Sequence, residues 1–429
     1  MSHNQNTRHR VVITGLGAIT GFGCGWKTMW QKMLAGHSAI RSWQLPEFSH
    51  FPVRYAAPVD WEIFADRYKT ESWWEKSQEK RARFGMAAGL EAITQANWSP
   101  SYKGRLGIAI GSGVPERVPQ DMLLAFKDGT LSWENLYQQA SHLNPHSGLQ
   151  HGNDQLATHL AHYLGATGPV LNLSTACAGA AHAIGLGMRM IRRGEADAVL
   201  AGGADSVLNL PTMIGLHLLG APSVCDKFGD QLCRPFDVKR SGFVAAEGAG
   251  MLLLESEEHA RQRGAHIFAE LAGFGSSLDA YRITAPHPEG FGAAYAMQRA
   301  LQDANLVPDE VALINAHGTS TPLNDPAETQ AIKQVFSKDQ HYRKLMVTAN
   351  KSMLGHLIAA AGAPELISTV LSVQNGIVPP TINLQHADPD CDLDYVPEKA
   401  RYRPVKSALS NSFGFGGLNA TLAVTRYEA

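Results

Sequence analysis

An α/β fold built from two similar halves is predicted by three features of the sequence. Short apolar, β-branched runs recur along the 429 residues, and each ends in Gly, Ser, Thr or Asn before a helix-like or turn-rich stretch. Runs of this length are typical of strands that helices bury on both faces, as in a parallel sheet. This series of strand-like runs and helix-like stretches occurs twice, and the second series begins near Glu270. We therefore expect an N-terminal half at 1–269 and a C-terminal half at 270–429.

The predicted strands divide unequally between the halves. The first half holds RVVITGLG, RLGIAIGSG, PVLNLSTA, ADAVLAGGADS and GAGMLLLES. The second half holds AELAGFGSS, VALINAHG, LMVTANKS and SALSNSFGFGG. Between Ser112 and Thr167 the pattern is poor, and we expect residues 112–167 to form an excursion from the core rather than a domain.

Composition excludes several classes of protein. Charged residues make up 18% of the chain and the net charge is −2, so no overall basic field favours nucleic acid. No uninterrupted apolar run approaches the ~18 residues that a membrane span requires, and the first residues lack the apolar core of a signal peptide. Five irregularly spaced cysteines indicate reduced thiols. We therefore expect a cytoplasmic protein that binds neither nucleic acid nor membrane.

One of the five cysteines, Cys177, lies where a predicted strand gives way to a helix. The segment VLNLSTACAGAAHAIGLGMRMIRRG predicts a helix after Cys177 that is apolar on every face and is therefore buried. A free cysteine is often only a small core residue. At a helix N-terminus, however, the dipole and the unpaired N–H groups favour the thiolate, which makes Cys177 a candidate nucleophile.

Three segments of the second half place reactive side chains just after predicted strands. They carry His317 in INAHGTSTPLND, Lys351 and His356 in ANKSMLGHLIAAAG, and Phe415 in the glycine loop of SNSFGFGGLNATLAV. Open α/β sheets bind their ligands at the carboxyl ends of the strands. We therefore expect Cys177 to share a nucleophilic site with the two histidines.

Other motifs receive structural interpretations. Asp325 and Glu328 in NDPAETQAIKQVF fit a helix cap and a capping box. The glycines of TGLGAITGFG fit a tight turn better than a dinucleotide site, because the third glycine and the distant acidic residue are absent. Pro364 is expected to kink or restart the helix that follows His356.

Five motifs follow one another along nearly the whole chain, namely STACA, RPFDxxRxGFVxxEGAG, NAHGTSTPxxDxxE, NKSMxGHxxxAAG and NSFGFGGxNA. Together they resemble those of the β-ketoacyl-acyl carrier protein synthases of the type I/II class, the KAS II-like ketosynthases of the thiolase-fold superfamily. The resemblance implies an α/β thiolase-like fold, with two duplicated βαβαβαββ halves in a five-layered αβαβα arrangement, and a dimer. It also implies a 3-oxoacyl-[acyl-carrier-protein] synthase, an acyltransferase that condenses malonyl-acyl carrier protein with an acyl group by decarboxylation.

The resemblance also assigns roles by position. Cys177 takes the place of the nucleophile, and His317 and His356 take those of two catalytic histidines. Lys351 matches the lysine near the second histidine, and Phe415 matches the gate in the glycine loop. The N–H groups of Cys177 and Phe415 are the expected oxyanion hole. The resemblance further places an acidic residue at Glu365 and the acyl pocket at Val114, Gly179 and Leu216.

The same resemblance bears on cofactors and partners. It implies no metal and no organic cofactor, because the phosphopantetheine arm arrives with the acyl carrier protein substrate. The expected second partner is another subunit, either an identical chain or a chain-length-factor-like subunit. One predicted helix face carries a cluster of basic residues, namely Lys76, Lys80, Arg81 and Arg83. This basic cluster is either a contact for the acidic surface of the carrier or a solvated helix face.

Two alternatives remain. The chain is a ketosynthase subunit of a type II polyketide or aryl-polyene system that works with a chain-length-factor partner, or it is itself a non-catalytic chain-length-factor-like subunit. Retention of Cys177, His317 and His356 argues against the non-catalytic alternative. The prolines of GSGVPERVPQ, together with Gly179 and Ala180, depart from the family pattern and either reshape a surface turn or stiffen the acyl pocket. A stiff pocket would accept unsaturated or polyketide-like chains at least as well as saturated ones.

Overall fold

The computed structural model describes residues 9–44, 50–77, 79–99, 104–113, 125–142 and 152–428. The first half follows the order βαβαβαββ, in the elements β1 (Val11–Thr20), α3 (Lys80–Gln95), β5 (Leu106–Ser112), α7 (Gln155–Leu164), β8 (Val170–Leu173), α8 (Gly179–Arg192), β9 (Ala198–Ser206) and β10 (Glu247–Ser256). The second half repeats that order in β11 (Ala269–Leu278), α11 (Phe291–Ala304), β12 (Leu313–Asn315), α12 (Asn324–Val335), β13 (Met346–Thr348), α14 (Gly362–Asn375), β16 (Ser407–Gly414) and β17 (Leu418–Thr425).

The order of the strands shows that the two halves are duplicates. Within each half the five strands lie in the order third, second, fourth, fifth, first: β8-β5-β9-β10-β1 and β13-β12-β16-β17-β11. In both halves the first two pairings of that order are parallel and the last two are antiparallel. Short pairing of β1 with β11 joins the halves into one sheet. The sheet is therefore mixed rather than wholly parallel, because the fourth and fifth strands of each half, and the fifth and first, pair in the antiparallel sense.

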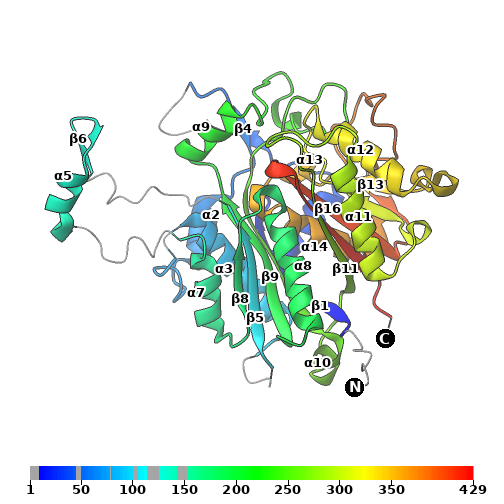
Figure 1. Ribbon diagram of the computed structural model, residues 1–429, viewed down its shortest axis with the longest axis horizontal. Coiled ribbons are helices and arrows are strands. Elements are labelled where there is room, and N and C mark those ends of the chain that lie inside the picture. Colours follow the sequence, from blue (N-terminus) through cyan, green and yellow to red (C-terminus); the bar gives the residue numbers. More distant parts are fainter. Residues whose placement is uncertain are drawn as a thin grey trace.

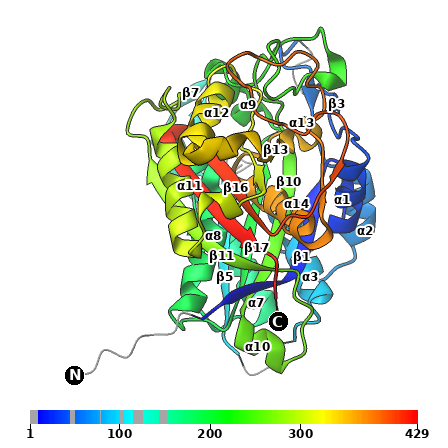
Figure 2. The same cartoon turned by 90° about the vertical axis from the view of Figure 1, so that its right-hand side faces the viewer.

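Helices divide the molecule into five layers (Figure 1). The pair α3 and α7 covers the outer face of the first half, and the pair α11 and α12 covers the outer face of the second. Between the halves lie α8 and α14, which contact strands of both. Figure 2 shows β16 next to β17, which in turn pairs with β11. The predicted αβαβα arrangement is confirmed.

Burial accounts for these layers. The middle helix α8 is buried along nearly its whole length, as its apolar composition predicts. It ends at Arg192, and Gly194 follows with φ of 69°, the left-handed conformation of a glycine cap. The helix α14 restarts after a short 3₁₀ turn and carries Pro364 in its first turn, where the missing N–H costs no helical hydrogen bond.

The remaining elements are short. They comprise the helices α1 (Trp26–Leu34), α2 (Trp61–Tyr68), α5 (Trp133–Gln138), α9 (Leu210–Leu218), α10 (Glu257–Gln262) and α13 (Lys351–Leu354), and the strands β2 (Gly23–Cys24), β3 (Arg41–Ser42), β4 (Tyr55–Ala56), β6 (Phe126–Lys127), β7 (Thr130–Leu131), β14 (Ile377–Val378) and β15 (Arg401–Tyr402). Within the described ranges, no helix is both long and apolar enough to cross a bilayer.

Part of the stretch 112–167 belongs to the core, contrary to the expectation of an excursion. Leu156 and Leu160 of α7 are buried in the same apolar cluster as Phe84 of α3. The short elements β6, β7 and α5 do stand apart from the layers in Figure 1. The sequence misleads here because α7 is amphipathic and contains two histidines, so its apolar face is narrow.

The predicted basic cluster does not form a common charged surface. Arg81 is only 3% exposed. Its guanidinium is paired with the carboxylate of Glu79 and donates to the carbonyl of Gly113 at 2.9 Å. The guanidinium of Arg83 lies 4.0 Å from the ring centre of Trp74. Arg81 is therefore neither a contact for the carrier nor part of a solvated helix face, and both expectations are wrong at this residue. Helical periodicity places its guanidinium in solvent, but Glu79 and Gly113 bind it in the interior.

Glycines allow the outer helices to lie directly on the strands. A Cβ added to Gly17 of β1 would lie 1.9 Å from the carbonyl oxygen of Ala88 in α3. Its counterpart in the second half, Gly275 of β11, would place a Cβ 2.0 Å from the carbonyl oxygen of Ala296 in α11. The glycines of TGLG thus lie inside a strand rather than in the predicted turn, and they serve close packing of helix on sheet.

We expect Gly17→Ala to lower the free energy of unfolding by on the order of 3 kcal/mol, because a backbone carbonyl blocks the new methyl group. Gly275→Ala should cost a similar amount. A matched control is Gly215→Ala in α9, where no atom lies within 4 Å of the new Cβ and where Ala is the better helix former. Equilibrium urea unfolding measures all three. Equal stability of Gly17→Ala and the control would contradict the close-packing account.

Candidate active site

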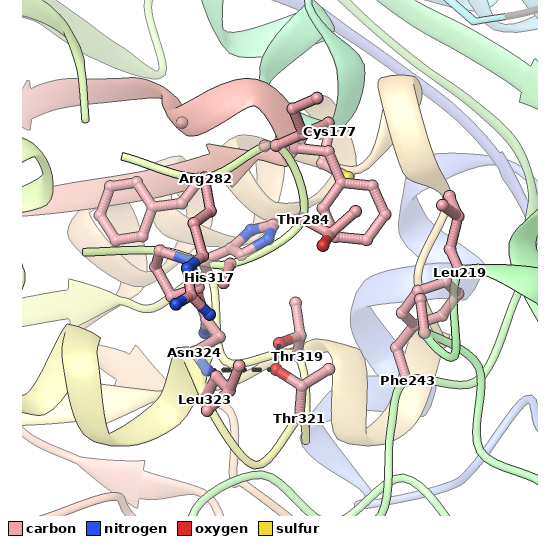
Figure 3. A pocket seen from close by; sticks show the side chains of 18 of the residues that line it. Cys177, Leu219, Phe243, Arg282, Thr284, His317, Thr319, Thr321, Leu323 and Asn324 are labelled. Carbon is pink, nitrogen blue, oxygen red and sulfur yellow. Dashed lines mark hydrogen bonds between the residues drawn. The ribbon is translucent and has the colours of Figure 1, made fainter. Parts of the chain in front are cut away.

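A cavity of about 410 Å³ opens where loops of the two halves meet (Figure 3). Cys177 lines it from the 3₁₀ turn between β8 and α8, and His317 lines it from the loop after β12. His356 reaches the cavity from just beyond α13, and Phe415 from the turn between β16 and β17. The structure thus brings four of the sequence-predicted residues to one cavity.

The turn that carries Cys177 is constrained on both sides. Ala176, directly before it, has φ of 45°, a left-handed conformation that costs a non-glycine residue about 1–3 kcal/mol. The Nδ1 atom of His182 lies 3.1 Å from the Thr175 hydroxyl, and Nε2 lies 2.8 Å from the hydroxyl of Ser276 on β11. His182 therefore ties the nucleophile turn to the second half, a role that no sequence pattern had indicated.

Burial dominates the ionisation of Cys177. The side chain is 6% exposed, and desolvation raises the pKa of its thiol to about 11. The charge of Lys351 opposes this rise, as do hydrogen bonds from the backbone N–H groups of Phe415 and of Cys177 itself. The helix start does offer donors to the sulfur, as expected, but they do not outweigh the loss of water. The resting nucleophile is therefore a neutral thiol.

His317 is held through its backbone by a carboxylate. The N–H of His317 donates to Oε1 of Glu328 at 2.8 Å, and the N–H of Gly318 donates to Oε2 at 2.9 Å. Asp325 accepts from the N–H of Phe236 at 2.9 Å and does not cap α12. The predicted capping roles of Asp325 and Glu328 are thus wrong, because both carboxylates face tertiary partners rather than the start of their own helix.

The backbone of His356 is bound in a short bridge to the first half. Its N–H donates to the carbonyl of Val244 at 2.7 Å, and its carbonyl accepts from the N–H of Ala246 at 2.9 Å. Ala246 lies in the motif RPFDVKRSGFVAAEGAG, which lacked a structural explanation at the level of sequence. That motif therefore serves to fix the position of the second histidine.

Lys351 links the two histidine segments from a fully buried position. Its Nζ donates to the carbonyl of His317 at 2.6 Å and to Oε1 of Glu365 at 2.6 Å, and it lies 3.2 Å from Nδ1 of His317. Three acceptors match the three protons of an ammonium group. Burial raises the pKa of Glu365 to about 7, against the opposing charge of Lys351. Lys351 and Glu365 thus form a buried pair behind the cavity.

Both histidines are neutral, and their partners assign the same tautomer to each. Burial, and then the charge of Lys351, hold the pKa values of His317 and His356 well below the usual range. Nδ1 of His317 faces the ammonium of Lys351, and Nδ1 of His356 accepts from the N–H of Ile358 at 3.3 Å. Since each Nδ1 is an acceptor, the proton of each ring resides on Nε2. The two rings lie 5.4 Å apart at nearly a right angle.

The glycine loop brings an amide to the sulfur. Gly414 packs so closely on the nucleophile turn that a Cβ there would lie 3.0 Å from the backbone nitrogen of Cys177. Gly416 adopts φ of 80°, and its N–H donates to the carbonyl of Ile283 at 2.6 Å. Phe415 is half-buried between these glycines and packs on the cluster that contains Phe243.

Neither Gly179 nor Leu216, two of the three residues expected in the acyl pocket, lines this cavity. Gly179 is buried where α8 passes β5 and the turn after His356. Leu216 packs on an apolar cluster beside the cavity, and Leu219, beyond the end of the same helix, is the leucine that lines it. Val114 lies outside the described residues. Sequence reasoning also missed Thr319, Thr321 and Asn324, which line the lower wall in Figure 3.

Comparison with known proteins agrees with this geometry. Residues 8–260 match the N-terminal domain of beta-ketoacyl synthase, and residues 268–385 match its C-terminal domain. The 3-oxoacyl-[acyl-carrier-protein] synthase 2 of Coxiella burnetii is 38% identical over 427 residues, which cover 98% of this chain and 99% of the relative. The enzyme of the same name from a Synechocystis species is also 38% identical, with the same coverage of both chains.

Solved structures are similar over the same length. One similar chain comes from a structure described as a type II PKS acyl-carrier protein in complex with its ketosynthase bound to the hexaketide. It superposes with a TM-score of 0.86 at 34% identity, and the match covers 98% of this chain and 100% of that chain. The ishigamide ketosynthase/chain length factor superposes with a TM-score of 0.84 at 32% identity and the same coverage.

A thiolase-fold enzyme, with a cysteine and two histidines in one cavity, is the class that the fold and the site define. More narrowly, the chain belongs to the β-ketoacyl synthase family and is a condensing enzyme of the acyltransferase class. The resemblance inferred from the five motifs is confirmed.

The pKa of Cys177 predicts how its alkylation depends on pH. Because only the thiolate reacts and the pKa is about 11, the rate of carboxamidomethylation by iodoacetamide should rise about tenfold per pH unit between about pH 7 and about pH 10. Peptide mass spectrometry isolates Cys177 from the other four cysteines. A model cysteine peptide, run in parallel, should level off near its own pKa of about 8.5. A plateau for Cys177 below that of the peptide would mean that the helix start dominates burial.

Proposed function

We propose that the chain catalyses the decarboxylative condensation of a malonyl thioester on acyl carrier protein with an acyl group held on Cys177. The proposal rests on the observation that Cys177 shares one cavity with two neutral histidines whose protons reside on Nε2. In this proposal the half at 1–269 supplies the nucleophile, and the half at 270–429 supplies His317, Lys351 and His356.

Acyl transfer comes first. The sulfur of Cys177 attacks the carbonyl of the incoming thioester, a C–S bond to the carrier's phosphopantetheine breaks, and the thiol proton ends on that departing sulfur. The N–H groups of Cys177 and Phe415 already face the sulfur of the thiol. They are therefore placed to stabilise the oxyanion of the tetrahedral intermediate, at about 3 kcal/mol for each donor.

Condensation follows on the acyl-enzyme. The malonyl thioester loses CO₂, and the electrons of the broken C–C bond pass into an enolate. Its oxygen accepts hydrogen bonds from the Nε2–H groups of His317 and His356, and the nearby charge of Lys351 stabilises the negative charge. The enolate carbon then attacks the acyl carbonyl, a C–C bond forms, and Cys177 departs as a thiolate that takes up a proton. These steps need no metal and no cofactor of the enzyme's own, because the phosphopantetheine arm belongs to the substrate.

A second subunit is part of the proposal. At one end of the sheet, β8 presents Val170 and Leu171 with 40% and 36% of their surface exposed, whereas β13 at the other end is buried. An exposed apolar edge strand is a site for pairing with another chain. We propose a dimer through β8, with either an identical chain or a chain-length-factor-like subunit, and a reducing, cytoplasmic setting that fits the five free cysteines.

Replacement of the histidines should separate the two half-reactions. His317→Ala and His356→Ala each lose an enolate donor, so the release of CO₂ from malonyl-carrier should fall by about 100-fold or more while acylation of Cys177 falls far less. Intact-mass spectrometry measures acylation, and trapping of labelled CO₂ measures decarboxylation. His162→Ala, an exposed histidine on α7, is the matched control. Cys177→Ala should form no acyl adduct. An adduct in that variant, or normal decarboxylation without either histidine, would contradict the proposal.

A polyketide or polyene pathway is the second candidate role, and the two similar ketosynthase structures favour it. The prolines of GSGVPERVPQ, which carried this expectation, lie outside the described residues. If they stiffen the acyl pocket, a conjugated acyl-carrier should acylate Cys177 at least as fast as a saturated one of equal length, because a rigid chain loses fewer rotors on binding. Direct competition of the two for Cys177, read by intact mass, measures this. A clear preference for the saturated chain would assign the enzyme to ordinary fatty-acid elongation.

A further inference from the structure

Asp205, near the end of β9, carries a fully buried carboxylate that the proposed mechanism does not use. Its Oδ1 accepts from the N–H of Ser206 at 3.0 Å, and its Oδ2 accepts from the N–H of Ala359 at 3.0 Å. Burial raises the pKa of Asp205 to about 7, against the opposing hydrogen bond from Ala359 and the charge of Arg81. A buried carboxylate is costly unless it is paired or hydrogen-bonded, so Asp205 depends on these partners.

The turn that Asp205 binds follows directly after His356 and is strained. Ile358 has φ of 48°, a left-handed conformation that is an outlier for a β-branched residue and costs about 1–3 kcal/mol. In this conformation the N–H of Ile358 donates to Nδ1 of His356 at 3.3 Å. Such strain persists only where the surrounding structure holds the backbone. Because Asp205 binds the N–H of the next residue, Ala359, it stabilises the conformation that fixes the tautomer of His356.

The opposite side of this turn lies against the start of α8, just after the nucleophile. A Cβ added to Gly179 would lie 3.1 Å from the carbonyl oxygen of Ala359. The N–H of Ala359 thus faces Asp205, and its carbonyl faces the helix that follows Cys177. A displacement of Asp205 would therefore change the position of His356 relative to Cys177.

The carboxylate of Asp205 has little freedom to move. A Cβ added to Gly113 would lie 2.5 Å from Oδ2 of Asp205, so the carboxylate occupies the place where any other residue would have its Cβ. The carbonyl of Gly113 accepts from the guanidinium of Arg81 at 2.9 Å, and that guanidinium also donates to Oδ1 of Asn153 at 3.2 Å. Arg81 thus holds Gly113 against the carboxylate.

We propose that Asp205 is a positioning residue for decarboxylation, which holds the turn Ile358–Ala360 so that His356 keeps its proton on Nε2 and presents it to the enolate oxygen. It acts through the turn rather than on the substrate. Lys351 faces Nδ1 of His317, so each donor ring is fixed by a different charged residue. The inference rests on the proposed function, because it assumes that His356 stabilises an enolate.

A double-mutant cycle tests whether Asp205 acts through His356. Asp205→Asn keeps the volume of the side chain but leaves one acceptor oxygen for two N–H groups. The kcat for release of CO₂ from malonyl-carrier should therefore fall about tenfold, while the KM changes less than about twofold. In the His356→Ala background the same substitution should cost less than about twofold, because the ring that it positions is absent. Gly113→Ala, whose methyl group would displace the carboxylate, should behave in the same way in both backgrounds.

The tautomer of His356 provides a second measurement. In Asp205→Asn the ¹⁵N shifts of His356 should show a fraction of the rings with a proton on Nδ1, because the N–H of Ile358 no longer occupies that atom, while the signals of His317 stay unchanged.

Asp303→Asn is the matched control. The carboxylate of Asp303 also accepts from a backbone N–H, that of Phe274 at 3.0 Å, and from an arginine, Arg192 at 2.8 Å. Asp303 is not among the described residues that line the cavity. Its substitution should leave the kcat within about twofold and both histidine tautomers unchanged.

Each result decides the inference. A loss of about tenfold that disappears in the His356→Ala background supports it. An equal loss in that background, an unaltered kcat in both Asp205→Asn and Gly113→Ala, or an identical change in the signals of both rings would overturn it. Should Asp205→Asn not fold, Gly113→Ala decides by the same cycle, since it retains the carboxylate. If the unmodified enzyme releases no CO₂ from malonyl-carrier, the proposed function fails, while the ¹⁵N shifts of His356 still test the positioning by Asp205.

Discussion

The buried ammonium of Lys351 holds together parts of the chain that no local interaction would join. It connects the start of α13, the loop after β12 and the first turn of α14, through His317 and Glu365. A charge buried this fully is tolerated only with complete hydrogen bonding, and removal of one partner of such a pair typically costs about 3–5 kcal/mol. Burial is the larger cause of the pKa shifts in the site, and the charge of the same ammonium opposes the rise at Cys177 and adds to the fall at both histidines. One buried cation thus fixes the geometry of the site, and together with burial it sets the ionisation of the site.

Duplication explains why the site lies between the halves. In each half the parallel strands lie in register up to their carboxyl ends, and the middle helix, α8 or α14, follows the third strand of that half. In the first half this position bears Cys177, at the turn into α8. In the second half the connection between β13 and α14 bears His356, and the neighbouring loop between β12 and α12 bears His317, each with a proton on Nε2. A single half supplies either a nucleophile or a pair of donors, and the chemistry needs both.

Local pattern predicted the nucleophile turn and the two histidine segments and indicated a duplication, because each depends on residues close in sequence, whereas the duplicated order of elements came from the resemblance of the five motifs. Local pattern failed for residues whose hydrogen-bond partners lie far away in the sequence. The spacing of Asp325 and Glu328 is that of a helix cap, but their acceptor oxygens bind Phe236 and the loop of His317. Arg81 has the periodicity of a surface cation, yet Gly113 and Glu79 bury it. The sequence analysis missed the strand β17, because the glycine-rich segment directly before it suggests only a loop.

The pKa of the Cys177 thiol is another property that local sequence pattern did not predict. A helix start lowers the pKa of a cysteine, and the sequence indicates that start correctly. The depth of the cavity raises the pKa further than the helix lowers it, and depth is a property of the assembled fold. The enzyme therefore keeps a neutral nucleophile and neutral donors together, which avoids the repulsion that two imidazolium groups beside Lys351 would create.

The central claim is that His317 and His356 are neutral hydrogen-bond donors through Nε2. The ¹⁵N chemical shifts of histidine side chains distinguish the two neutral tautomers from the imidazolium, and His317→Ala and His356→Ala assign the two signals among the 18 histidines. We expect both rings at pH 7 to be neutral, with a proton on Nε2 and an unprotonated Nδ1, and to remain neutral at pH values below the ordinary histidine pKa of about 6.5. A proton on Nδ1 of either ring, or an imidazolium signal at pH 7, would contradict the account.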